Sequence, residues 1–185
     1  IMPADPKSIH ESYRYAVQEH KGPVVMLEHR LLYELSFEDD NNELSHPLFG
    51  SKLEREGSDL TIITTSVMVL EAKRAAVHLS RNNISVEIIN LHSISHPDKE
   101  MILKSVEKTG KMLIADTSWA AYGVAAEMNR IVNEYNPSIL KVPTKSMGMV
   151  NTPCPTAKVL EDMYYPDVHD IVDVCAGMVL GKDHS

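Results

Sequence analysis

Two histidines and a lone carboxylate are the first residues in this chain whose types and positions could carry out chemistry. His92 and His96 lie four residues apart, a spacing that places two metal ligands on one face of a helix. However, Pro97 follows directly and Ser-Ile-Ser lies between the two histidines, so we expect a loop here. No carboxylate or cysteine completes a ligand set at metal-site spacing. We therefore predict no metal site and expect surface or packing histidines.

Nucleophilic and phosphate-binding motifs are also missing from the sequence. The chain contains no Gly-x-Ser-x-Gly turn that would present a catalytic serine, and no glycine-rich phosphate loop. Glu28 follows a short apolar segment and could act as a general base, but no second titratable group is visible to pair with it. The residues alone therefore predict no catalytic and no cofactor-binding position.

One segment, from Trp119 to Glu127, has the composition of a contact surface. Two aromatic residues, Trp119 and Tyr122, are followed by Gly123 and surrounded by alanines. Small side chains allow backbones to approach closely, and aromatic side chains supply large contact areas. We expect a helix capped by Ser118, which would project both aromatics from one side. Two interpretations stay open: helix–sheet packing within one domain, or a subunit interface through Trp119, Tyr122, Gly123 and Glu127.

The composition narrows the classes of partner. A chain of 185 residues is long enough for one full domain and a further segment. With 43% hydrophobic residues, it can form a hydrophobic core without metals or disulfides. The net charge of -8 argues against nucleic acid, and no apolar run approaches the roughly 20 residues of a membrane span. Cys154 and Cys175 form no disulfide framework. We therefore expect reduced thiols and a cytoplasmic location, or the mitochondrial matrix in a eukaryote.

The first 35 residues predict a helix and a strand without partners. Ser8 and Glu11 fit a capping box at the start of the helix, and Gly22 and Pro23 end it. The apolar run 24–27 then predicts a short strand. A single helix and strand cannot bury both of their apolar faces, so this segment requires partners from elsewhere. Residues 36–56 follow as an expected surface linker, because the acidic stretch 37–43 has no apolar period.

From residue 57 onward, strand and helix patterns alternate. The expected strands are 60–65, 84–89, 111–115 and 139–142, and the expected helices begin near Ser66, Pro97, Ser118, Thr156 and Pro166. The last helix has an apolar stripe of Val168, Ile171, Val172, Cys175 and Val179. Such alternation predicts an α/β layer fold with a mostly parallel sheet.

Five stretches together resemble a known family. They are 22–33, 54–62, 86–98, 153–171 and the segment from Trp119 to Glu127. In order and spacing they are similar to the beta subunit of the decarboxylating component of 2-oxoacid dehydrogenase complexes, in the transketolase superfamily, and most like the pyruvate members. The resemblance covers nearly the whole chain.

The resemblance implies a domain plan and a function. Residues 57–185 would form a three-layer α/β/α domain of the transketolase C-terminal type with a mostly parallel sheet. Residues 1–35 would be the end of a pyrimidine-binding domain, and 36–56 the linker. The complete enzyme would decarboxylate a 2-oxoacid oxidatively and transfer the acyl group to a lipoyl carrier. This portion would serve subunit assembly.

The resemblance also implies cofactors and partners. In the family, thiamine diphosphate and magnesium are held by an upstream glutamate and by the alpha subunit, so we expect neither cofactor on this chain alone. Expected partners are an alpha subunit, a second beta subunit and a lipoyl acyltransferase core. The family's potassium site is not carried over, because Lys21 lies in the corresponding loop and would repel a cation. His92 stands where the family usually has arginine.

Two alternatives remain open for the function. One is a related transketolase-type enzyme that acts on a sugar or an acyloin. The other is a free-standing, non-catalytic assembly module.

Overall fold

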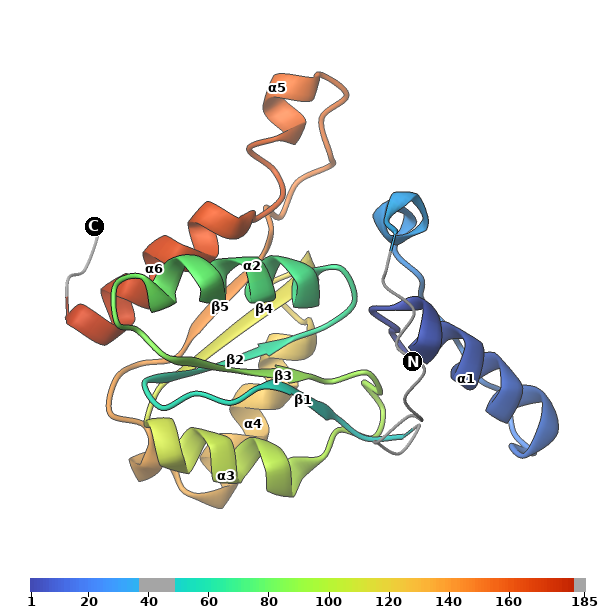
Figure 1. The fold of residues 1–185 in the computed structure, drawn as a ribbon, viewed down its shortest axis with the longest axis horizontal. Helices are drawn as coiled ribbons and strands as arrows, with labels where there is room; N and C mark the ends of the chain where they lie inside the picture. Colours follow the sequence, from blue (N-terminus) through green and yellow to red (C-terminus); the bar gives the residue numbers. More distant parts are fainter. Residues whose placement is uncertain (37–48, 182–185) are drawn as a thin grey trace.

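A five-stranded sheet with helices on both faces forms the body of the molecule (Figure 1). The computed structural model describes residues 1–36 and 49–181. The strands are β1 (Lys52–Arg55), β2 (Leu60–Thr64), β3 (Val86–Asn90), β4 (Met112–Trp119) and β5 (Lys145–Met149), in the order β1-β3-β2-β4-β5. Strand β1 runs antiparallel to β3, whereas the other neighbouring strands are parallel. The predicted three-layer fold with a mostly parallel sheet is confirmed.

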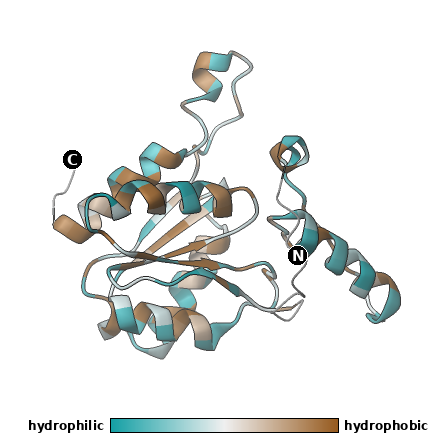
Figure 2. Cartoon of the chain, viewed as in Figure 1, coloured by the Kyte–Doolittle hydropathy of each residue, from teal (hydrophilic) through white to brown (hydrophobic). Residues whose placement is uncertain are grey.

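The helices divide between the two faces of the sheet. Helices α2 (Met68–Ser80) and α6 (Val168–Leu180) cover one face, and α3 (Lys99–Thr109) and α4 (Val124–Tyr135) cover the other. Because side chains alternate along a strand, Ile62 packs with α2 and α6 while its neighbour Ile63 packs with α3 and α4. The central strands accordingly carry apolar side chains toward both faces, and much of their ribbon is brown in Figure 2. Within the described ranges, none of the helices has the length and apolar character needed to traverse a bilayer.

The apolar stripe predicted for the last helix is confirmed. Ile171 and Cys175 are fully buried, and the remaining stripe residues pack partly buried around them. Burial raises the pKa of the Cys175 thiol to about 12, so this thiol stays protonated at neutral pH. Asp167 caps α6 by accepting from the Asp170 amide at 3.1 Å. The helix therefore begins next to the predicted Pro166.

Several predicted helix starts differ from those observed. Helix α1 (Pro6–Gln18) begins one turn before the predicted capping box, because Asp5 accepts from the Ser8 amide at 2.7 Å. Ser66 does not cap α2, since its φ of 50° is left-handed and a capping residue needs an extended backbone. The start of α3 is as expected, with Asp98 accepting from the Met101 amide at 2.9 Å.

Two strands also differ from the predictions. Residues Lys52–Arg55, which we expected to belong to the linker, form strand β1. The acidic stretch 37–43 of that linker lies outside the described residues. The fourth predicted strand, 139–142, is wrong: Pro137–Ile139 forms a short 3₁₀ helix, η2, and the strand β5 follows it. The helix predicted over 156–164 is limited to α5 (Lys158–Glu161).

The N-terminal segment meets the body through backbone hydrogen bonds and through Leu32, which lies in the core cluster. The run 24–27 is not a regular strand, although Leu27 donates to the Ile1 carbonyl at 2.9 Å and Met2 donates to the His92 carbonyl at 2.7 Å. The Glu28 carboxylate accepts from the hydroxyls of Tyr13 and Tyr33, each at 2.8 Å, and so joins α1 to the 3₁₀ helix η1 (Arg30–Glu34). Large apolar side chains of this segment remain exposed, namely Tyr13, Val17, Val25, Leu27, Leu31 and Tyr33.

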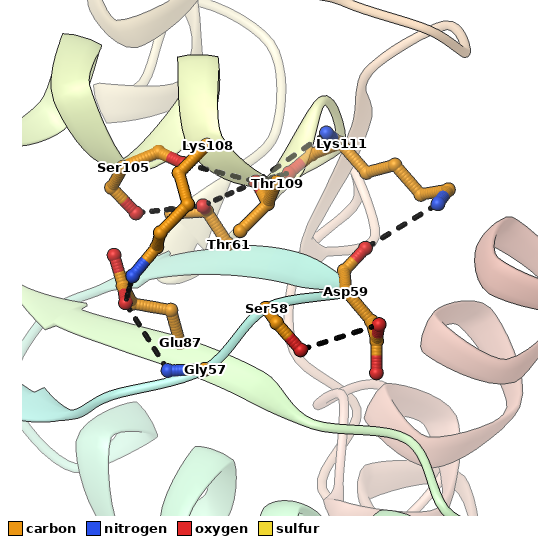
Figure 3. Close-up of polar contacts among 9 residues, drawn as sticks. All are labelled: Gly57, Ser58, Asp59, Thr61, Glu87, Ser105, Lys108, Thr109 and Lys111. Atoms are coloured by element: carbon orange, nitrogen blue, oxygen red, sulfur yellow. Dashed lines mark hydrogen bonds and ion pairs between the residues drawn. The ribbon is translucent and has the colours of Figure 1, made fainter.

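A polar network secures the end of the sheet where β2 and β3 begin (Figure 3). The Glu87 side chain is buried, pairs with Lys108 from α3 and accepts from the Gly57 amide at 3.1 Å. Beside it, the Thr61 hydroxyl lies 2.7 Å from that of Ser105. Burial alone would raise the pKa of Glu87, but the hydrogen bonds from Lys108, Ser105 and Gly57 hold this pKa below its ordinary value of 4.5.

We expect Glu87→Gln to remove a pH-dependent part of the stability. The folded-state pKa of Glu87 lies below its unfolded value, so the carboxylate stabilises the fold above about pH 4.5. This contribution is lost as the pH falls through the folded-state pKa. Urea unfolding between neutral pH and about pH 3 should show wild type and variant converging on acidification. Glu107→Gln, on the exposed face of α3, should leave the unfolding curves unchanged. A difference that is constant with pH would contradict the role of the carboxylate.

Candidate subunit interface

The four residues predicted for a subunit interface lie around the junction of β4 and α4. Trp119 is the last residue of β4, Tyr122 and Gly123 lie in the connecting loop, and Glu127 is in the first turn of α4. The prediction of one helix from Ser118 is wrong, because β4 continues far enough for Trp119 to pair with Met149 of β5. Trp119 and Tyr122 therefore do not share a helical face.

An irregularity in β4 shapes this junction. Ala115 pairs with Met147 and Trp119 with Met149, so three residues of β4 bulge opposite the single residue Gly148. A Cβ atom on Gly148 would lie 2.4 Å from the Ser118 carbonyl oxygen, which explains why glycine occupies this position. Beyond the bulge, β4 ends at Trp119, and the loop that follows exposes Tyr122 fully.

A buried carboxylate holds the bulge in place. Asp116 is only 4% exposed and accepts from the Thr65 hydroxyl at 2.9 Å, the Thr117 amide at 2.7 Å and the Ser118 hydroxyl. Gly123 closes against the same cluster, since a Cβ there would lie 2.8 Å from the Ser118 hydroxyl oxygen. Asp116 is not among the residues predicted from the sequence, although a carboxylate directly after a buried apolar strand is the signal that could have identified it.

Trp119 is half-exposed and joins the loop to a later part of the chain. Its side chain is 46% exposed, and the indole N–H donates to the Tyr164 hydroxyl oxygen at 3.4 Å. The Tyr164 hydroxyl in turn donates to the Thr152 carbonyl at 2.8 Å. Tyr164 is buried and meets Tyr165 edge to face at 5.0 Å. Trp119 therefore contributes both to internal packing and to the surface.

Residues 150–165, here called the arm, extend away from the layers and carry α5 at their tip (Figure 1). The arm exposes large apolar side chains, namely Val150, Val159, Leu160, Met163 and Tyr165. An isolated exposed leucine is ordinary, but a projecting segment with several such side chains marks an interaction surface. The arm and the Trp119 side chain together form one candidate contact region.

A shallow depression adjoins this region. It has a volume of about 360 Å³ and lies between β5, the arm and the start of α6. Ala120 from the loop and Met147 from β5 line it, together with Tyr164, Tyr165 and Asp173. Its walls are therefore partly apolar and partly acidic.

The charge of Glu127 is paired within its own helix and is not directed at the contact region formed by Trp119 and the arm. Its carboxylate accepts from Arg130 at 2.6 Å within the same helix, and Arg130 also pairs with Glu134. The hydrogen bond from Arg130 lowers the pKa of Glu127, despite a small opposing effect of burial. All three side chains are exposed, and exposed pairs of this kind stabilise a helix only slightly.

The described residues hold no metal-binding cluster. Within residues 1–36 and 49–181, no group of three or more His, Cys, Asp or Glu side chains could hold a metal ion. His92 is buried with a left-handed backbone, while His96 contacts the ring of Phe49 at 5.2 Å. The two histidines therefore lie in different surroundings, His92 in the interior and His96 at the surface.

The mostly parallel five-stranded sheet with helices on both faces agrees with a domain of the transketolase C-terminal type. The sequence profile of the transketolase C-terminal domain matches residues 50–171, and the chain belongs to this family. A solved structure titled as a split gene transketolase, inactive beta4 tetramer, has a TM-score of 0.64 at 20% identity. The match covers 75% of this chain and 44% of that one, and it supports the fold.

Homologues of the chain are beta subunits of the pyruvate dehydrogenase E1 component. The mitochondrial subunit beta-1 of Arabidopsis thaliana is 39% identical over 154 residues, which are 81% of this chain and 42% of that protein. The subunit of Rickettsia bellii is 31% identical over 169 residues, which are 86% of this chain and 52% of that protein. The chain thus spans about half the length of the curated relatives it matches. The resemblance found in the sequence is confirmed.

Proposed function

We propose that this chain is part of the beta subunit of a thiamine-diphosphate-dependent 2-oxoacid dehydrogenase of the pyruvate type. The observation that carries the proposal is the similarity to pyruvate dehydrogenase E1 beta subunits over more than four fifths of the chain. The complete enzyme would decarboxylate the 2-oxoacid and transfer the acyl group to a lipoyl carrier. An alpha subunit and a lipoyl acyltransferase core would be its further partners.

The described domain would serve subunit assembly within that enzyme. The exposed Trp119 side chain, the loop that follows it and the apolar arm supply a contact surface for a second beta subunit. Aromatic anchors beside small residues are typical of the centres of such interfaces. The structural relative that shares this fold is itself titled a tetramer of beta chains.

The N-terminal segment would be completed by further chain. Its exposed apolar side chains, among them Val25 and Leu31, require a covering surface. The curated relatives are about twice as long as the matched region, which is enough for a second domain. We therefore assign residues 1–35 to the end of a pyrimidine-binding domain and the part from residue 57 to the assembly domain. Strand β1 extends the assembly domain back to Lys52, and the intervening linker then runs from 36 to 51.

Thiamine diphosphate and magnesium do not fit the residues present. The described part of the chain has no cluster of ligands for a cation, and the sequence has no glycine-rich loop for a diphosphate. The buried Asp116 carboxylate already accepts three hydrogen bonds from the protein. No chemical step is therefore assigned to this chain.

We expect isothermal titration of this chain with thiamine diphosphate and magnesium to show no binding in the micromolar range. The physical reason is that neither the diphosphate nor the cation would find a preformed site. A complete two-subunit enzyme of this class, titrated in the same buffer, serves as the positive control. Micromolar affinity of the isolated chain would contradict the assignment of this portion to assembly alone.

A further inference from the structure

The depression between β5, the arm and the start of α6 has an acidic side. Asp170 and Asp173 both line it, and none of the lining residues that the structure describes is a lysine, an arginine or a histidine. Oδ2 of Asp170 accepts from the Asp167 amide at 2.9 Å, which leaves Oδ1 open. Asp173 forms neither a hydrogen bond nor an ion pair within residues 1–36 and 49–181. Both aspartates are exposed, so their free oxygens can be reached by a solute and favour a cation.

Two tyrosines form an aromatic corner in the wall that the arm supplies. The rings of Tyr164 and Tyr165 lie at 86° to each other, with their centroids 5.0 Å apart. Tyr164 donates its hydroxyl proton to the Thr152 carbonyl at 2.8 Å. Tyr165 donates its own to Cys154 Sγ at 3.6 Å. Because both phenolic protons are committed within the arm, the two side chains offer a ligand their ring surfaces. A ring face carries partial negative charge and attracts a cation.

The other walls narrow the class of occupant further. Met147 and Met163 contribute thioether side chains, and Val150 and Val174 contribute aliphatic ones. A metal ion needs a shell of several ligands, and the described residues hold no group of three or more side chains that could supply one. An anion would be repelled by the two carboxylates, and an uncharged apolar molecule would cover them without a partner. A cation with an alkyl body satisfies the acidic side and the apolar walls together.

We propose that this depression binds a small organic cation, namely a protonated primary amine or a guanidinium group on a short alkyl chain. Its N–H groups donate to Asp173 and Asp170, and its alkyl chain lies against Met147 and the ring of Tyr165. The volume of about 360 Å³ is at the low end of the range for small-molecule pockets and suits a ligand of this size. Every wall comes from one chain, so the site is independent of the assembly role proposed above.

An NMR titration of the wild-type chain with n-butylguanidinium tests the site. We expect saturable shifts of backbone amides around the depression, among them those of Ser146, Gly148 and Asp173, with a dissociation constant of about 1 mM or below. n-Butylurea has nearly the same shape without the charge, and it should bind at least about tenfold more weakly. Equal affinity for the two probes, shifts confined to another part of the chain, or no saturable shift at all would overturn the proposal.

Substitution of Asp173 tests whether a local carboxylate holds the cation. Asp173→Asn keeps the size of the side chain and removes its charge, so the dissociation constant should rise at least about tenfold. Glu107→Gln removes the same charge from the exposed face of α3 and should leave the constant unchanged. If the two variants weaken binding equally, the cation is attracted by the net charge of -8 alone and the proposed site is wrong.

Substitution of Tyr165 tests the aromatic wall. Tyr165→Leu keeps an apolar side chain but removes the ring face, and the dissociation constant should rise about threefold. Tyr165→Phe keeps the ring and loses only the hydrogen bond to Cys154, so it should bind the probe like the wild type. If the leucine variant also binds like the wild type, the ring does not contact the cation and this part of the site is wrong.

Discussion

Ile171→Asp should lower the free energy of unfolding by about 3 to 5 kcal/mol, a large fraction of the stability of a domain. Ile171 is fully buried in the cluster that joins α6 to α2 and to the sheet. A carboxylate at this position would be taken out of water without a cation to pair with. Urea unfolding followed by circular dichroism measures the loss, together with the thermal midpoint.

Leu180→Asp is the matched control for this substitution. Leu180 ends the same helix but is 58% exposed, so its replacement should cost at most about 1 kcal/mol from the unfavourable charge at the helix C-terminus. Equal losses for the two variants would show that the position of the charge on α6 does not matter. An unchanged midpoint for Ile171→Asp would show that α6 does not pack on the sheet.

Trp119→Ala should weaken the association of two chains by about 2 kcal/mol or more, which is about a 30-fold rise in the dissociation constant. Truncation removes the exposed half of the indole from the interface. It also removes the hydrogen bond to Tyr164, which positions the arm beside the contact region. Sedimentation at several concentrations measures the association, and circular dichroism measures the fold in parallel.

Trp119→Phe separates the two roles of this side chain. Phenylalanine keeps a large apolar ring but cannot donate to Tyr164, so it should retain most of the association. If Trp119→Ala unfolds the chain, Trp119 is a core residue and the interface interpretation is wrong. If the alanine variant stays folded and associates like the wild type, the exposed part of the indole makes no subunit contact.

Elements with strong local signals could be predicted from the sequence. Asp98 and Gly110 mark the two ends of α3, because an aspartate cap and a terminal glycine act within one turn. The stripe that contains Ile171 and Cys175 identifies the buried face of α6. The isoleucine-rich sequences of β2 and β3 predict strands that are buried on both faces.

Elements determined by distant neighbours could not be predicted in this way. Strand β5 contains lysine, serine and glycine, which have little strand preference, and it exists because β4 pairs with it. The helical spacing of Trp119 and Tyr122 is misleading for the same reason, since pairing with Met149 extends β4 to residue 119. Tertiary contacts override local propensity at both positions.

The candidate interface could be predicted only in part. Its aromatic residues, Trp119 and Tyr122, are visible in the sequence. In the structure Trp119 is half-exposed and Tyr122 is fully exposed. The depression is not visible, because it combines Ala120, Met147 and Asp173 from three separate elements. The role of Asp116 depends on Thr65, which is 51 residues earlier in the chain.

Sedimentation equilibrium of the wild-type chain over a wide concentration range tests the central claim most directly. The claim is that this domain builds the contact between two beta subunits through the Trp119 region and the arm. The account predicts that the weight-average mass rises with concentration from one chain of 20.7 kDa to two chains, and that Trp119→Ala shifts this rise to higher concentration. A mass of one chain at every concentration would contradict the account.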